Sequence, residues 1–210
     1  MRVSLKKFVK ILVFAVMVMA AASTARASVV IDFSSAGAFG GTVTTDGTDW
    51  FATGIPILTV RVTGAPTNNG LYVVSGDASD IEFGTCCAAL NFDTKLGTIS
   101  IVGSVPLLGL GNQTLLSGTI ASFGTSGSGS NFRIDADGPD QKSAELLRAL
   151  GLPVDQQFAF FGFSQGLALN SDGTYYSTSS DITNVPEPGT LALFGVGLLG
   201  VARKLRKVVA

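Results

Sequence analysis

Apolar and polar residues alternate with a period of two along the middle of the chain, and this period is typical of strands that bury one face. The clearest runs are residues 57–63, where Leu and Val alternate with Thr and Arg, and residues 132–137, where apolar residues alternate with Arg and Asp. Further strands are predicted at residues 29–33, 71–75, 98–102, 114–122, 157–165 and 167–170.

Turn-forming dipeptides separate these runs. They are Asp46-Gly47, Asn69-Gly70 and Asp172-Gly173, together with the flexible Gly/Ser-rich stretch 124–130. Asn69-Gly70 closely precedes one predicted strand and Asp172-Gly173 joins two, so we expect hairpins there.

A single helix is predicted at residues 141–150, where Leu146, Leu147 and Leu150 share one face and Gly151 follows as a stop signal. Eight or more short strands with one helix, and no alternation of strands with helices, predict an all-β fold. We expect an antiparallel β-sandwich or jelly-roll ectodomain.

The first 27 residues have the layout of a secretory signal peptide. Four cations (Arg2, Lys6, Lys7 and Lys10) precede the apolar run 11–22, and Ala25 and Ala27 stand three residues and one residue before a cleavage point. Signal peptidase is therefore the expected partner, and the ectodomain is expected to span residues 28–184. An uncleaved anchor is the alternative.

The last 26 residues, 185–210, also form a three-part segment. Pro186, Glu187 and Pro188 come first, and the uncharged run 191–202 follows. Four cations then come in five positions: Arg203, Lys204, Arg206 and Lys207. Twelve helical residues reach only about 18 Å, so the run predicts a marginal transmembrane helix that its neighbours extend. Because Lys and Arg flanks stay cytoplasmic, these cations would act as a stop-transfer cluster.

This segment closely resembles the PEP-CTERM protein-sorting domain. The resemblance implies that Pro186, Glu187 and Pro188 are recognised by an exosortase, a membrane-embedded transpeptidase-like protease. It further implies a precursor held transiently in the inner membrane of a Gram-negative-type bacterium. The product would then move to the cell surface or an extracellular polysaccharide (biofilm) matrix. Gly189 stands where many relatives carry Ala.

Composition excludes several functions. The 210 residues contain no His, so Ser-His-Asp and Cys-His catalysis and His-ligated metals are excluded. Residues 28–185 hold five basic and fourteen acidic side chains, a net charge of −9. Such an acidic body argues against nucleic acid and anionic lipid as partners.

Three motifs match known catalytic, nucleotide-binding or metal-binding patterns, but the neighbouring residues that these functions require are missing. Gly162-Phe163-Ser164-Gln165-Gly166 matches the G-x-S-x-G elbow of esterases, which would make Ser164 a nucleophile, but a downstream His base is missing. The G-x-G-x-x-G match at residues 195–200 lies inside the apolar C-terminal run. Asp135, Asp137 and Asp140 could supply oxygens to calcium, but their spacing is not that of an EF-hand, and a solvated turn leading to a helix cap is the preferred interpretation.

Cys86 and Cys87 are the only thiols. Their Cα atoms are about 3.8 Å apart in any trans peptide, below the usual disulfide range of about 4.4–6.8 Å. A vicinal disulfide is slightly favoured over free thiols and intermolecular bonds.

We therefore expect a non-enzymatic, exported surface or matrix protein with no cofactor and no bound metal. The alternative is a secreted carbohydrate-binding module in which Trp50, Tyr72, Tyr175 and Tyr176 stack on sugar. A hydrolase acting through Ser164 is the third hypothesis.

Overall fold

The computed structural model describes residues 29–76, 78–80, 84–156 and 158–185, which fall within one compact unit, Val29–Glu187. Its strands pair antiparallel throughout. They are β1 (Val30–Ser34), β2 (Gly40–Thr45), β3 (Trp50–Ile57), β4 (Thr59–Thr63), β5 (Gly70–Val73), β6 (Ala78–Asp80), β7 (Gly84–Asp93), β8 (Thr98–Val105), β9 (Leu110–Thr119), β10 (Ser122–Ser128), β11 (Asn131–Lys142), β12 (Phe158–Leu169) and β13 (Tyr175–Val185).

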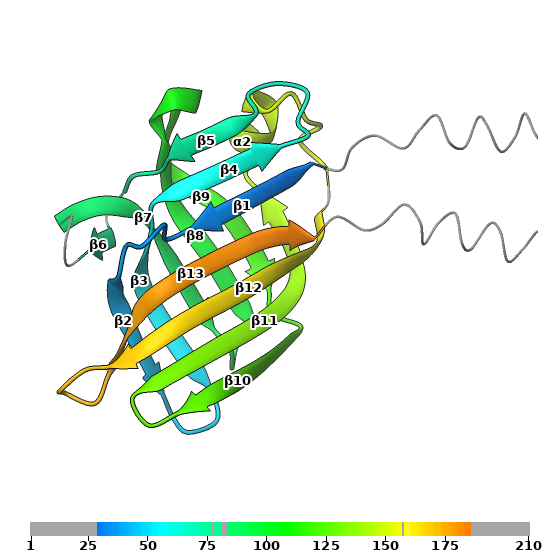
Figure 1. The fold of residues 1–210 in the computed structure, drawn as a ribbon. Helices are drawn as coiled ribbons and strands as arrows, with labels where there is room; N and C mark the ends of the chain where they lie inside the picture. The colour runs from blue at the N-terminus through cyan, green and yellow to red at the C-terminus, as the bar shows by residue number, and fades with distance from the viewer. Residues whose placement is uncertain (1–28, 77, 81–83, 157, 186–210) are drawn as a thin grey trace, which may run out of the picture. The chain divides into compact units, whose positions relative to one another are not determined.

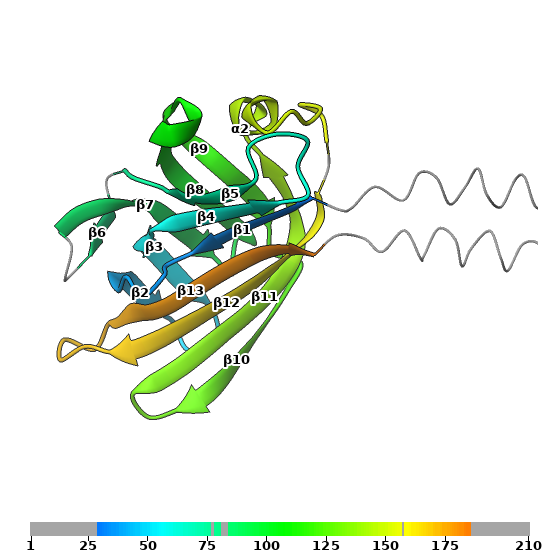
Figure 2. The ribbon, with the colours of Figure 1, turned by 45° about the horizontal axis from the view of Figure 1, so that its top comes forward.

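One continuous sheet makes both layers of the body. The order is β3-β2-β6-β7-β8-β9-β11-β12-β13-β1-β4-β5, with β10 paired to β11. Additional pairings of β3 with β7 and of β2 with β13 curl the sheet on itself. Figures 1 and 2 show β10 to β13 with β1, β4 and β5 as one layer and β2, β3, β7, β8 and β9 behind it. The described chain is thus mostly antiparallel β in a barrel- or sandwich-like sheet, as expected.

The core lies between these layers. It includes Ile31 and Phe33 of β1, Leu90 of β7, Ile101 of β8 and Ile134 of β11, each fully buried. They occupy alternate positions of their strands, because successive side chains of a strand point to opposite faces. The apolar positions of the period-two pattern therefore lie on the face of each strand that points to the core.

The predicted helix is shorter than expected. Helix α2 spans Ala144–Ala149, and the Ser143 hydroxyl caps it by accepting a hydrogen bond from the Leu146 amide at 3.2 Å. Gln141 and Lys142 belong instead to β11, where they continue the alternation of exposed and buried positions. Leu146, Leu147 and Leu150 are buried, as their shared face predicted.

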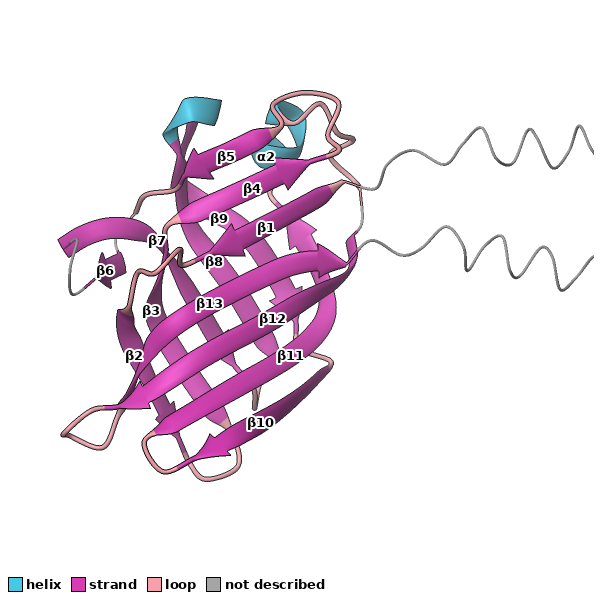
Figure 3. Cartoon of the chain, in the orientation of Figure 1, coloured by secondary structure: helices cyan, strands magenta, loops and turns pink. Residues whose placement is uncertain are grey.

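Two other expectations differ from the structure, and one further element was not expected (Figure 3). The Gly/Ser-rich stretch 124–130, expected to be a flexible separator, includes most of β10, a strand that pairs along β11. The strands predicted at 157–165 and 167–170 are one strand, β12, with a pairing irregularity at Gly166/Leu167. A short 3₁₀ helix, η1 (Pro106–Leu108), lies between β8 and β9.

The hairpins expected at two turn dipeptides are present. Asn69-Gly70 leads from β4 into β5, and Asp172-Gly173 connects β12 to β13. Figure 1 shows this second hairpin protruding at one end of the body.

Candidate functional site

Both ends of the described chain lie at one end of the body. β1 starts at Val30 and β13 ends at Val185, and the two strands pair with Asp32 opposite Thr183. Figure 1 shows the start of β1 beside the arrowhead of β13. The described chain therefore begins and ends at the same end of the body.

The last residues of β13 remain paired. Asn184 lies opposite Phe161 and Val185 opposite Phe160 in the ladder with β12. Sheet pairing therefore continues to the residue directly before Pro186. No spacer separates the folded body from the proline-rich segment.

Two loops surround this end, and we call residues 64–69 and 150–156 the termini-proximal loops. The Thr67 amide donates to the Leu150 carbonyl at 3.2 Å, and the Asn68 side-chain amide donates to the Ala149 carbonyl at 2.7 Å. The Tyr72 hydroxyl donates to the Asn68 carbonyl at 2.7 Å. These hydrogen bonds join the two loops into one surface.

A pair of carboxyl groups lies on the outer face of β1 and β13. Burial raises the pKa of Asp32 to about 6, and the neighbouring Asp181 adds to this rise through a hydrogen bond and charge repulsion. Thr183 donates to the Asp32 carboxylate at 3.0 Å, and Arg61 on β4 lies opposite Asp32; both partly counteract the rise.

The structure also contains a buried ion pair that the sequence analysis missed. Lys142 Nζ lies 2.7 Å from Asp140 Oδ2, and both side chains are fully shielded from solvent. The ammonium group is 4.9 Å from the ring centroid of Phe158. Burial lowers the pKa of Lys142 to about 8 and raises that of Asp140, although each is the other's counter-charge. Extending the alternation of residues 132–137 to position 142 would have placed both residues on the core face.

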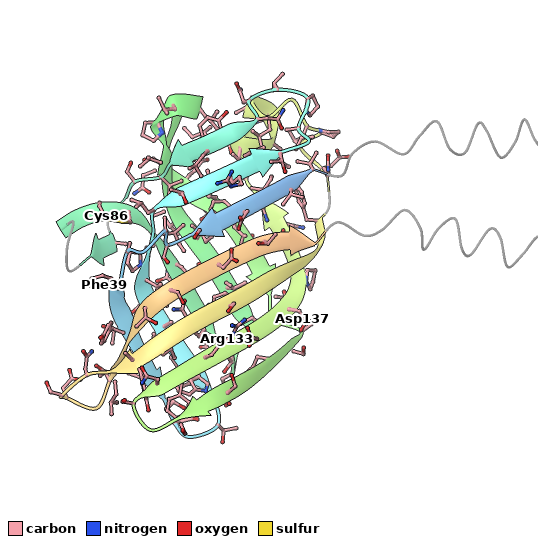
Figure 4. The ribbon with its side chains drawn as sticks, viewed as in Figure 1. Phe39, Cys86, Arg133 and Asp137 are labelled. Carbon is pink, nitrogen blue, oxygen red and sulfur yellow. A yellow bond between two sulfur atoms is a disulfide. The ribbon has the colours of Figure 1, made fainter. Side chains whose placement is uncertain are left out.

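Cys86 and Cys87 are joined by a disulfide in the structure. Cys87 is buried with Ala38 and Ala78 in a small apolar cluster, against which Cys86 packs. Figure 4 shows Cys86 on β7. The bridge therefore belongs to a packed part of the body.

The G-x-S-x-G motif lies within a strand. Ser164 is in the middle of β12, with Asp135 of β11 opposite on one side and Asp181 of β13 opposite on the other. An esterase elbow needs a sharp turn from a strand into a helix, and β12 continues to Leu169. The local geometry therefore does not match this motif's function.

The Asp cluster is divided between the two faces of β11 rather than placed in a turn. Asp135 and Asp137 are exposed, whereas Asp140 points to the core. Figure 4 shows Asp137 and Arg133 on the outer face of β11. Among the described residues no group of three His, Cys, Asp or Glu side chains is placed to hold a metal ion.

The aromatic residues of the carbohydrate-binding alternative do not form one platform. Trp50 is 7% exposed and packs against Phe132 and Tyr175 at centroid distances of 5.7 and 5.4 Å. Tyr72 lies at the termini-proximal loops, at the other end of the body from Tyr175, which begins β13. Trp50 is a core residue in this structure.

The remaining predicted site residues lie outside the described residues. They are Ala25 and Ala27, the sorting motif Pro186, Glu187 and Pro188, and the basic cluster Arg203, Lys204, Arg206 and Lys207. Within the described ranges no helix is long and apolar enough to cross a bilayer.

Comparison with known families gives one match, to the PEP-CTERM protein-sorting motif at residues 184–207. The match begins one residue before the end of β13. Searches of curated proteins and of solved structures give no match. The chain therefore carries a PEP-CTERM sorting motif, which implies recognition by an exosortase, export, and a membrane-associated precursor.

Proposed function

We propose that the protein is a non-enzymatic ectodomain, exported by its signal peptide, tethered transiently in the inner membrane and cleaved by an exosortase at Pro186–Pro188. The match of residues 184–207 to the sorting motif carries this proposal. After cleavage the body moves to the cell surface or the extracellular matrix.

The position of the chain ends supports the proposal. Because β1 and β13 are neighbouring antiparallel strands, the described chain begins and ends at one end of the body, where a tether after Val185 would join it. The absence of His from the sequence and the position of Ser164 inside β12 support a role without catalysis.

Mass spectrometry of the mature protein from cells that contain an exosortase tests the proposal. We expect a first residue at Ser28 and a last residue close to Pro186–Pro188. The variant Pro186→Ala/Pro188→Ala should keep residues 191–210 and stay with the membrane. The matched control Pro106→Ala/Pro139→Ala changes two exposed prolines outside the termini-proximal loops and should be cleaved as the wild type is.

Two outcomes contradict the proposal. Peptides from residues 201–210 in the extracellular fraction of wild-type cells would show that the segment is not removed. Normal trimming of Pro186→Ala/Pro188→Ala would show that these prolines are not recognised.

A further inference from the structure

We propose that, in the membrane-tethered precursor, the termini-proximal loops (64–69 and 150–156) form the surface that rests on the lipid headgroups, with the long axis of the body upright. This inference rests on the proposed function, since it requires residues 191–202 to be anchored in the bilayer. The proposed partner of the loops is a lipid surface. Three observations support this: the short segment between Val185 and the apolar run, which we call the tether, the topology of the strands, and the distribution of charge.

The tether is short. Residues 186–190 separate the end of β13 at Val185 from the first residue of the apolar run, Leu191. Six Cα–Cα steps span at most about 20 Å when fully extended. The headgroup layer occupies about 6 Å of this distance, since a bilayer of about 40–45 Å has a hydrocarbon core of about 30 Å. The end of β13 is therefore close to the headgroups in every conformation of the tether.

Strand topology decides which other residues share that end. β12 starts beside the end of β13, and the loop 150–156 leads toward its start. Loop 64–69 connects the end of β4 to β5, and β4 ends opposite the start of β1. Both loops therefore surround the point where the tether leaves the body.

In the upright orientation the opposite end of the body lies too far from the bilayer to contact the headgroups. Three turns lie at that end, and we call them the distal turns: residues 46–49, 94–97 and 170–174. They are neighbours because the Thr94 amide donates to the Trp50 carbonyl and the Trp50 ring packs on the Tyr175 ring. β12 has twelve residues and so spans about 36 Å between the two ends.

Charge favours the upright orientation. The termini-proximal loops contain one charged residue, Asp155, whereas the distal turns contain three Asp and one Lys. The outer face of the front layer carries the exposed carboxylates of Asp135, Asp137 and Asp181. Two exposed cations, Arg61 and Arg133, lie on the same face, and Arg133 pairs with Asp135 at 2.8 Å, so the carboxylates remain in excess there. An anionic bilayer surface would repel that face if the body lay on its side.

Apolar side chains are also exposed at the loops. Val154 is 47% exposed, and Leu71, next to loop 64–69 at the start of β5, is 55% exposed. Leu96 in a distal turn is 74% exposed, so apolar exposure does not distinguish the two ends, and the orientation depends on the tether and the charges. Contact with headgroups need not be strong, because the tether holds the loops at a high effective concentration at the surface.

Fluorescence quenching tests the orientation in the full chain. The chain is reconstituted into anionic phospholipid vesicles that contain a lipid with a nitroxide on its headgroup. Val154→Trp adds a reporter to a termini-proximal loop, and the matched control Ser171→Trp adds one to an exposed position of a distal turn. Native Trp50 is common to both variants. We expect the added Trp at position 154 to be quenched severalfold more than that at 171.

Insertion of ten Gly/Ser residues between Val185 and Pro186 gives a second measurement. We expect it to reduce the difference between the two reporters, because it lengthens the reach of the tether. Equal quenching of the two reporters, stronger quenching at 171, or no quenching at either overturns the inference. A further outcome also overturns the inference: the emission of the Trp at 154 shifts as the protein density in the vesicles rises, and it is not quenched. A second copy of the chain, rather than lipid, would then cover the loops.

Flotation of the same vesicles after alkaline extraction separates this inference from the proposed function. A chain that is washed off is not anchored, and both proposals fail. If the chain floats with the lipid but the Trp at 154 is not quenched more than the Trp at 171, the anchored precursor is supported and only the upright orientation is refuted.

Discussion

The buried pair of Asp140 and Lys142 allows a quantitative test of the core. Nζ and Oδ2 are 2.7 Å apart, and Asp140 Oδ1 is buried without a hydrogen-bond partner in the structure. Lys142→Met keeps an apolar stem of similar length but removes the cation. Asp140→Val removes the carboxylate. The two changes and their combination form a double-mutant cycle.

The expected magnitudes follow from desolvation. Breaking a buried ion pair leaves an uncompensated charge and costs about 3–5 kcal/mol, whereas replacing both partners by apolar residues is often neutral or stabilising. We therefore expect each single variant to lose about 3–5 kcal/mol and the double variant to be close to the wild type. Non-additivity of several kcal/mol is the signature of the pair.

The pH dependence of stability gives an independent prediction. The pKa of Lys142 is lowered by burial to about 8. Between that value and the ordinary pKa of about 10.4, the unfolded chain binds the proton and the folded chain does not, so stability rises with pH. The rise attributable to Lys142 is at most about 3 kcal/mol, and it should be missing in Lys142→Met.

Denaturant unfolding of residues 28–187 at pH 7 and at pH 10 measures these quantities. The fluorescence of Trp50, the single Trp of the chain, reports unfolding because its side chain is buried. Lys95→Met is the matched control, since the Lys95 side chain is 63% exposed. Single variants within about 0.5 kcal/mol of the wild type, with additive effects, would refute the buried pair.

Two further predictions concern β12 and β1. Gln165→Leu should destabilise the body by about 1–3 kcal/mol, because Gln165 is fully buried and donates to the Ser177 hydroxyl at 2.7 Å. The control Gln141→Leu changes an exposed position of β11 and should change the unfolding midpoint little. The raised pKa of Asp32 contributes stability that is fully present below pH 3.8 and is lost as the pH rises through about 6. Asp32→Asn should therefore gain stability relative to the wild type between pH 4 and pH 7, and a difference that stays flat with pH would contradict the raised pKa of Asp32.

Strands that alternate strictly were predictable because the pattern reports burial of one face. β4 and β11 are examples: Val60 and Val62, and Ile134 and Ala136, all reach the core. The hairpin at Asp172-Gly173 indicated a strand after it, but no range was predicted for β13, because Ile182 is its one buried large apolar side chain among those described. Its buried positions include Ser177 and Ser180, which bond to Gln165. Core-facing positions of this strand are therefore held by polar groups in tertiary hydrogen bonds, which a hydrophobic pattern does not reveal.

The length of α2 also could not be predicted from local sequence. Residues 141–150 are compatible with a helix, but Lys142 continues the alternation of β11 and lies in the core beside Asp140 and the Phe158 ring. That environment is built by β12, which follows α2 in the chain. A local window of sequence does not contain it.

The sequence by itself determined the sorting motif, the acidic character of the body and the antiparallel β class, because these depend on residue types and short-range order. Only the tertiary structure decided that β1 and β13 are neighbours and that Ser164 lies inside a strand. It also decided that Asp140 and Lys142 are buried together. The reason is that pairing between distant strands depends on which surfaces pack against each other, and no single segment encodes its partner.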